Sequence, residues 1–403
     1  MEPASSNPKY AEADAQLIKS LAATIEARDF DIIPISNAAK PAIVFRRGMP
    51  HDLFSAAGNH PAFRGFREKF FGEQQVLLQG DCQGLIRRAL ETDAEEAVGW
   101  LHKVYNTDVA DFLLIAEVFG IGIDRSLTFP NSVDLVRVHD LPKSQLSREL
   151  QFQADHEGGV PFTPSKIFAV YLVNGIKVAT KPTRENLFDR GCEEINRVMD
   201  ALTLLDHVAP AVGAAWLQFS DPDLDAFRGW MATRMANHDG IRPTFAQYSV
   251  SIGDVPRVAP FFSLPADCAK RTQTPIRRLN LARRRTSPGD KAIDGCIALE
   301  AMFSDDKDAL AHKVAVRVAR YLETDYEARL DIKSKAKAFY ALRSQVVHGS
   351  KPKGDPAQAA SDGVRLCARV LQKIVIDCCM PDLDELDLGP STTIGPARDN
   401  DHG

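Results

Sequence analysis

The chain has 403 residues and a formal net charge of −5, with 44% hydrophobic and 26% charged residues. This composition excludes disordered, collagen-like and low-complexity proteins, and the length predicts about two domains. The longest apolar run, residues 112–123, contains Glu117 and is too short to cross about 30 Å of hydrocarbon, so no membrane partner is expected. No signal-peptide pattern is visible, and the seven cysteines are scattered, which predicts a cytoplasmic protein.

Residues 1–240 are predicted to form an α+β domain. Runs of β-branched and aromatic residues bounded by Gly or Pro indicate strands, and segments with helical apolar spacing lie among them. The expected strands are residues 31–35, 42–46, 113–124 and 167–179, and the expected helices are residues 11–27, 85–105 and 193–207.

The histidines of residues 1–240 are assigned no chemical role. Their separations fit no metal-ligand pattern, and no phosphate-binding loop is visible. Arg46 and His51 have the spacing R-x4-H, but Gly48 and Pro50 lie between them, so no helix is expected to carry this pair. We therefore expect no metal ion and no cofactor. The histidines concerned are His51, His60, His102, His139, His156 and His207.

The remainder of the chain is predicted to be helical after a connector. Residues 241–275 are rich in Pro, Ser and short apolar pieces, which indicates the connector. Residues 276–385 predict a bundle of antiparallel helices, because short loops join segments with helical apolar spacing. The polar end, residues 386–403, is expected to be disordered. The four expected bundle helices are residues 291–303, 306–322, 326–348 and 359–379.

Positive charge is concentrated in this helical part. Residues 270–353 contain 19 Lys and Arg and 10 Asp and Glu, whereas the rest of the chain contains 30 basic and 44 acidic residues. Such an asymmetry indicates two parts with different partners, and a basic segment fits RNA. A solvated linker is the alternative for the densest run. The candidate RNA-binding residues are Arg277, Arg278, Arg283, Arg284 and Arg285.

Two charged residues, Glu300 and Arg343, occupy positions in otherwise apolar helical stripes. An isolated buried charge costs several kcal/mol, so each is expected to have a partner or to line a polar pocket. They are suitable partners for each other. A buried salt bridge that only sets the helix register is the alternative interpretation.

The end of the third bundle helix carries a histidine. Gly349 is a natural left-handed stop and Pro352 cannot continue the helix, which places His348 in the last turn. Arg343 and His348 lie about 140° apart around an ideal helix, whereas Ser344 and His348 share a face. One copy of the helix therefore does not focus Arg343 and His348 on one point, but two copies facing each other in a dimer would.

An arginine and a histidine beside a basic surface suit metal-free cleavage of RNA. The ribose 2′-hydroxyl attacks the adjacent phosphorus and a 2′,3′-cyclic phosphate forms. A histidine can accept or deliver the proton, and an arginine can bind the phosphate oxygens as negative charge develops.

The sequence FYALRSQVVHG, preceded by DKAIDGCIALEAMF, resembles the Apea-like branch of the HEPN domains. The likeness covers residues 275–380 and rests on the Leu-Glu-Ala first helix, the Arg-rich second helix and the Arg-Ser-x-x-Val-His-Gly ending. Domains of this family are helical bundles that usually dimerise. Many are metal-independent ribonucleases with an R-x4–6-H motif, and several belong to toxin–antitoxin or anti-phage systems.

The resemblance implies an all-α HEPN-type bundle in which Arg343 and His348 are the catalytic pair. Glu300 matches the acidic residue of the first helix and would orient Arg343. Ser344 stands where many members have a polar residue, and Tyr340 would line the pocket, with a core tyrosine as the alternative. The resemblance further implies an RNA substrate, a homodimer, and a sensor or inhibitor in residues 1–240 that answers a phage-derived or cellular trigger.

Two other functions remain open at this point. The bundle would also suit a non-catalytic module that binds nucleic acid or protein and dimerises, in which the basic run matters more than His348. The third option is a purely structural bundle in which Glu300 and Arg343 form the register salt bridge.

Overall fold

The computed structural model describes most of the chain and divides it into two compact units. The first unit comprises Met1–Asn196 and Val212–His238, and the second comprises Arg197–Ala211 and Asp239–Gly403. No described helix combines the length and the apolar character that a membrane span needs. The described residues are 10–33, 42–64, 79–142, 166–177, 181–206, 208–221, 224, 234–235, 248–304, 310–351 and 354–388.

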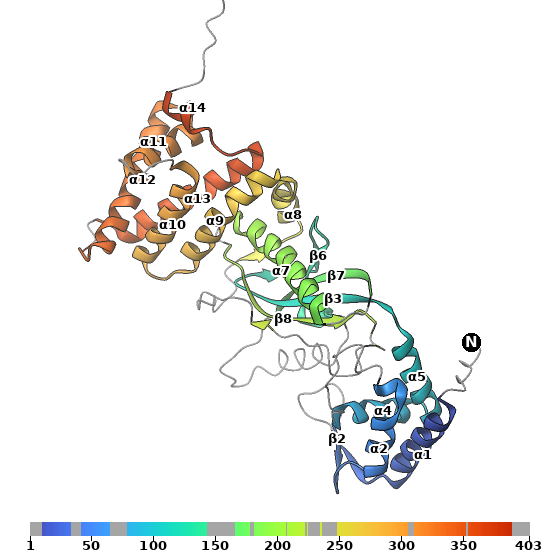
Figure 1. Cartoon of the computed structure of the whole chain (residues 1–403). Helices are drawn as coiled ribbons and strands as arrows, with labels where there is room; N and C mark the ends of the chain where they lie inside the picture. Colours follow the sequence, from blue (N-terminus) through green and yellow to red (C-terminus); the bar gives the residue numbers. More distant parts are fainter. Residues whose placement is uncertain are drawn as a thin grey trace, which may run out of the picture. The chain divides into compact units, whose positions relative to one another are not determined.

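The first unit begins with a group of packed helices, here called the N-terminal helical cluster (Figure 1). Its core contains fully buried leucines from three helices, Leu17, Leu53 and Leu101. The strands β1 (Phe30–Ile33) and β2 (Ala42–Phe45) pair in antiparallel register beside it. The helices of the cluster are α1 (Ala11–Ala27), α2 (His51–Asn59), α4 (Gln79–Glu91) and α5 (Ala94–Asn106).

The single helix expected over residues 85–105 is wrong, because the segment forms α4 and α5. Asp93 ends the continuity: its backbone is extended, and its carboxylate accepts a hydrogen bond from the Glu96 amide at 2.7 Å. This N-cap satisfies an otherwise free amide of α5 and fixes the start of a new helix.

A six-stranded sheet follows, with the strand order β5-β6-β7-β3-β8-β9. The long helix α7 (Lys181–Thr203) approaches it so closely that a Cβ on Gly191 would lie 2.6 Å from the Leu114 side chain. Glu117, which interrupts the apolar run of β3, accepts a hydrogen bond from the Ala214 amide of β8 at 3.0 Å. The strands are β3 (Val109–Phe119), β5 (Leu127–Thr128), β6 (Val133–Arg137), β7 (Ile167–Lys177), β8 (Ala211–Phe219) and β9 (Arg234–Met235). The two-residue strand β4 (Gly122–Ile123) and a 3-10 turn, η1 (Val138–Asp140), lie between them in the chain.

The second unit is a helical bundle apart from the two-residue strand β10 (Ser249–Val250). Three of its helices begin at side-chain caps, since Ser287, Asp325 and Asp355 accept hydrogen bonds from the amides of the first turns of α10, α12 and α13. The helices are α8 (Asp254–Val258), a 3-10 helix η2 (Ala259–Ser263), α9 (Ala266–Arg284), α10 (Pro288–Phe303), α11 (Leu310–Leu322), α12 (Tyr326–Val347), α13 (Pro356–Asp377) and α14 (Leu383–Leu388).

The expected α+β region followed by a helical bundle is confirmed at this level of detail. Two details need correction. Within the expected connector, residues 254–263 form α8 and η2 and residues 266–275 belong to α9, and residues 386–388 belong to α14 rather than to a disordered tail. Residues 305–309 and 389–403, which include the expected start of the second bundle helix and the rest of the tail, lie outside the described residues.

Candidate functional site

The centre of the candidate site is an ion pair between α10 and α12. Arg343 Nη1 donates a hydrogen bond to Glu300 Oε1 at 3.0 Å, and the two side chains are 33% and 20% exposed. The contact expected from the two charges in apolar stripes is therefore present. It is open enough to water for Arg343 to meet a ligand, and buried enough to hold its guanidinium in place.

Burial dominates the electrostatics around this pair. It raises the pKa of Glu300, although the Arg343 charge and the Tyr340 hydroxyl act in the opposite direction. Tyr340 is 6% exposed. Its burial raises the pKa of its hydroxyl, and the nearby Cys296 adds a smaller effect in the same direction. The Arg343 Nε atom is buried and has no hydrogen-bond partner among the described residues. The guanidinium thus keeps donor capacity beyond its bond to Glu300.

His348 is the C-cap residue of α12 and is exposed. The helix ends in a Schellman motif: the Gly349 amide donates to the Val346 carbonyl at 3.1 Å, and the Ser350 amide donates to the Gln345 carbonyl at 2.8 Å. Gly349 has a φ of 68°, as its predicted role as a left-handed stop requires. Ser344, one turn before His348, is also exposed.

The structure therefore brings together only part of the predicted site. Glu300, Arg343 and Tyr340 lie close together, whereas no interaction between the described residues joins His348 to Arg343. This agrees with the angle of about 140° that separates the two positions around the helix.

Three of the five predicted RNA-binding arginines bond to groups of the second unit, namely Arg278, Arg283 and Arg285, and contact of the five with RNA stays a prediction. Arg278 Nη1 and Arg285 Nε each donate to the carboxylate of Asp294 at 2.9 Å, and Asp294 is only 4% exposed. Arg284 is half-buried, and Arg277 is exposed. Arg278 and Arg285 therefore balance a buried carboxylate.

Arg283 departs furthest from the expectation. Its Nη1 donates to the backbone carbonyl oxygens of Thr203, Leu205 and Val208 at 2.5, 2.8 and 2.8 Å. Burial lowers the pKa of Arg283 to about 10. These contacts give it a structural role that the sequence alone does not reveal.

A pocket of about 470 Å³, here called the basic pocket, lies in the second unit. Its charged lining consists of Arg283, Lys291, Arg365, Arg369 and Asp206. Arg369 pairs with Glu323 at 2.6 Å, and Arg365 lies 3.9 Å from Asp362. Sequence reasoning missed this pocket because its cations come from α9, α10 and α13. Only the spacing of Arg365 and Arg369, one helical turn apart, was a visible signal.

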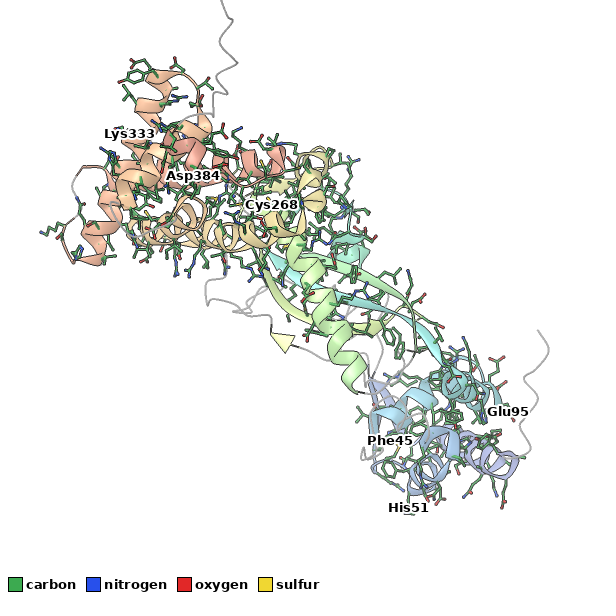
Figure 2. The ribbon with its side chains drawn as sticks, turned by 45° about the horizontal axis from the view of Figure 1, so that its top comes forward. Phe45, His51, Glu95, Cys268, Lys333 and Asp384 are labelled. Carbon is green, nitrogen blue, oxygen red and sulfur yellow. The ribbon has the colours of Figure 1, made fainter. Side chains whose placement is uncertain are left out.

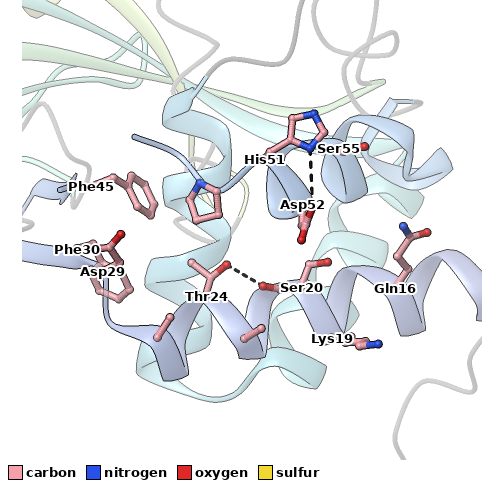
Figure 3. A pocket seen from close by; sticks show the side chains of 13 residues that line it. Gln16, Lys19, Ser20, Thr24, Asp29, Phe30, Phe45, His51, Asp52 and Ser55 are labelled. Carbon is pink, nitrogen blue, oxygen red and sulfur yellow. Dashed lines mark hydrogen bonds and ion pairs between the residues drawn. The ribbon is translucent and has the colours of Figure 1, made fainter. Parts of the chain in front are cut away.

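In the first unit, a second pocket of about 450 Å³ lies beside α1, α2 and the strands β1 and β2 (Figure 3). His51 Nδ1 lies 3.8 Å from Asp52, but both side chains are more than 90% exposed. Arg46 pairs with Asp31 instead of His51, and α2 begins only at His51. The interpretation of Arg46 and His51 as a chance match is therefore supported.

The N-terminal helical cluster contains a group of residues to which the sequence assigned no role. Asp14, His60 and His102 place their ligand atoms within 4.8 Å of one another. Separations of 46 and 88 residues from Asp14 give no sequence signal for such a group.

Comparison with known proteins adds no assignment to these sites. No family model matches the chain, and neither a curated protein nor a solved structure is significantly similar to it.

Proposed function

We propose that the second unit is a HEPN-type endoribonuclease in which Arg343 and His348 act on RNA. The observation that carries the proposal is the state of these two residues. Arg343 is held by Glu300 while its side chain stays 33% exposed, and His348 is exposed at the end of the same helix. Because they point to different sides of α12, a homodimer would supply Arg343 and His348 from different copies.

The chemistry assigned to this pair requires no group beyond the substrate and these side chains. The 2′-oxygen forms a bond to phosphorus while the bond to the 5′-oxygen breaks, giving a 2′,3′-cyclic phosphate and a 5′-hydroxyl end. His348 takes the proton of the 2′-hydroxyl and returns it to the leaving 5′-oxygen, or the His348 side chains of two copies divide these two transfers. Arg343 donates hydrogen bonds to the non-bridging oxygens, which gain charge in the transition state.

The test is RNA cleavage by the full chain and its variants. Arg343→Ala and His348→Ala are each expected to reduce cleavage about 10²–10³-fold, with cyclic phosphate ends on the wild-type products. His312→Ala removes another exposed histidine of the second unit and is expected to leave the rate unchanged. Thermal melting of each variant separates lost activity from lost folding.

The proposal fails if the wild-type protein cleaves no RNA and if Arg343→Ala and His348→Ala also behave as wild type when expressed in cells. Loss of stability in Arg343→Ala, with cleavage per folded molecule unchanged, would instead assign the Glu300 ion pair a purely structural role.

The basic pocket favours a second function, the binding of a phosphate-bearing ligand such as RNA without catalysis. Lys291 and Arg365 are the variants of choice, because Arg283 is already bonded to backbone carbonyls. Salt-dependent RNA binding that survives His348→Ala and weakens in Lys291→Ala and Arg365→Ala would support it. Binding that is equal in all these variants would contradict it.

The first unit would then act as a sensor or inhibitor of the second, in a defence or toxin–antitoxin setting. The resemblance of the C-terminal part is the basis of this extension. A full chain whose RNA cleavage does not change under any tested cellular or phage-derived trigger would count against it.

A further inference from the structure

Asp14, His60 and His102 converge in the interior of the N-terminal helical cluster. Asp14 Oδ1 lies 2.8 Å from His60 Nε2 and 2.7 Å from His102 Nε2. Asp14 is 7% exposed, His60 is fully buried, and the His102 side chain is 17% exposed. Three different parts of the chain supply the group: α1 carries Asp14, His60 follows α2 directly, and α5 carries His102.

Two imidazoles are the side chains that meet the buried carboxylate of Asp14 among the described residues. No Lys or Arg is among the partners of Asp14 in the described part of the chain. A buried carboxylate is costly unless it is paired with a cation or coordinates one. A dication at the point where the three atoms converge would supply that charge.

The donor set has the chemistry of a transition-metal site. Two imidazole nitrogens and one carboxylate oxygen are ligands that Zn²⁺ and its first-row neighbours take, with bonds of about 2.0–2.2 Å. Tetrahedral ligands at that distance stand about 3.3 Å apart. The present contacts would therefore widen by about 0.5 Å, and the partly exposed His102 side chain is the one with room to move.

Aromatic rings surround the three ligand atoms. The rings of His60 and His102 meet edge-on with centroids 5.6 Å apart, and the Tyr10 ring lies 5.4 Å from that of His102. These contacts hold the three ligand atoms in place, and the partly exposed His102 side chain leaves a path for the water that completes the coordination.

We propose that Asp14, His60 and His102 form a binding site for a divalent transition-metal ion of the zinc class, which fastens α1, α2 and α5 to one another. Three protein ligands leave the remaining coordination to water. The site belongs to the first unit and is independent of the RNA cleavage proposed for the second.

The test is metal binding by the full chain after removal of metal with a chelator. Cys378 and Cys379 are adjacent exposed thiols that can bind zinc, so both are replaced by Ser in every protein compared. In this background we expect each chain to bind one equivalent of Zn²⁺, and we expect the Co²⁺-bound protein to absorb visible light. Affinity should fall at least tenfold in His102→Gln and in Asp14→Asn, and the thermal midpoint of the parent should rise on adding Zn²⁺.

His51→Gln is the matched control, because His51 belongs to the same helical cluster (Figure 2), and its side chain and that of the neighbouring Asp52 are exposed. Its zinc affinity should equal that of the parent. A measurement that needs no site variant is the nitrogen NMR of the histidine rings, since an ion on Nε2 forces the His60 proton onto Nδ1. The proposal is overturned if the parent binds no Zn²⁺ or Co²⁺, if His102→Gln and Asp14→Asn bind as well as the parent, or if the ring nitrogens do not respond to Zn²⁺.

Discussion

Arg283 ties the end of α9 to the segment that follows α7. Its Nη1 donates to the carbonyl oxygens of Thr203, Leu205 and Val208, of which the Leu205 oxygen also accepts from the Val208 amide. A run of arginines in a sequence suggests a surface that binds a polyanion such as RNA. The sequence does not show which backbone carbonyls pack against these arginines in the folded protein. Of the five arginines predicted to bind RNA, only Arg277 is exposed rather than half-buried.

We predict that Arg283→Ala destabilises the protein by about 2–4 kcal/mol, because it removes a largely buried cation that donates to three backbone carbonyl oxygens. Arg277→Ala removes an exposed arginine of the same helix and should change the stability by less than about 0.5 kcal/mol. Urea unfolding of both variants gives the comparison. Equal stabilities would show that the carbonyls are satisfied without Arg283.

Asp200 lies on the last turn of α7, and its burial leads us to predict that the stability of the protein depends on pH. Burial raises its pKa to about 7 from 3.8, and the charge of Arg277 opposes the shift. The folded protein then holds a proton that the unfolded chain releases near pH 4, so this carboxyl makes the protein less stable as the pH rises from about 4 to 7.

The Asp200→Asn side chain cannot titrate. At pH 8 the free energy of unfolding of this variant should therefore exceed that of wild type by on the order of 2 kcal/mol, and at pH 4 the two values should be equal. Thermal melting at both pH values is the measurement. Asp267→Asn changes an exposed carboxylate at the start of α9 and should show no such gain. A gain of the same size at pH 4 and pH 8 would rule out titration as its cause.

At the scale of elements, the helices α10 to α13 were predictable because their apolar spacing and their end signals agree, whereas α8, α9 and α14 were not predicted. The Schellman motif at Gly349 is the clearest case. The strand β8 was missed, since its run Ala-Val-Gly-Ala-Ala has few of the β-branched and aromatic residues typical of strands. The break between α4 and α5 had a readable signal in the pattern Asp93-x-x-Glu96, which is typical of a helix start.

The helices α10, α12 and α13 meet at Phe339, and two glycines make this possible. A Cβ on Gly363 would lie 2.1 Å from the Phe339 ring, and one on Gly295 would lie 2.5 Å from it. Phe339 is fully buried. Glycine in a helix interior costs up to about 1 kcal/mol relative to alanine, so its presence here reflects the space that the ring needs.

We predict that Gly363→Ala lowers the free energy of unfolding by about 1–3 kcal/mol, despite the better helix propensity of alanine. Gly99 of α5 has open space around its Cβ position, and Gly99→Ala should stabilise by about 0.5–1 kcal/mol. Phe339→Leu should cost less in the Gly363→Ala background than in wild type, because the smaller side chain relieves the clash. Additive effects in this double-mutant cycle would refute the contact as the cause.

At the scale of the whole molecule, the second unit is not continuous in the sequence. Residues 197–211 belong to it, although the strands β8 and β9 of the first unit separate them from residue 239 onward. Composition and charge placed the division near residue 240 and could not reveal this earlier segment. The Glu300–Arg343 contact was predictable from charges within apolar stripes. The Asp14 group was not, because its members are far apart in the chain.

The segment 197–211 should therefore be required for a stable second unit. It supplies hydrogen-bond acceptors to three side chains of the second unit. Arg283 donates to its backbone carbonyls, Asn280 donates to Thr203 Oγ1 and the Pro210 carbonyl, and Gln372 donates to the Leu204 carbonyl. A fragment of residues 241–403 lacks all of them and should melt more than about 10 °C below the same fragment joined to residues 197–211 by a flexible Gly/Ser linker. A fusion carrying only Gly and Ser in place of residues 197–211 should melt like the bare fragment. Equal melting of all three proteins would show that the helices from α8 onward fold independently, and that the earlier segment only rests against them.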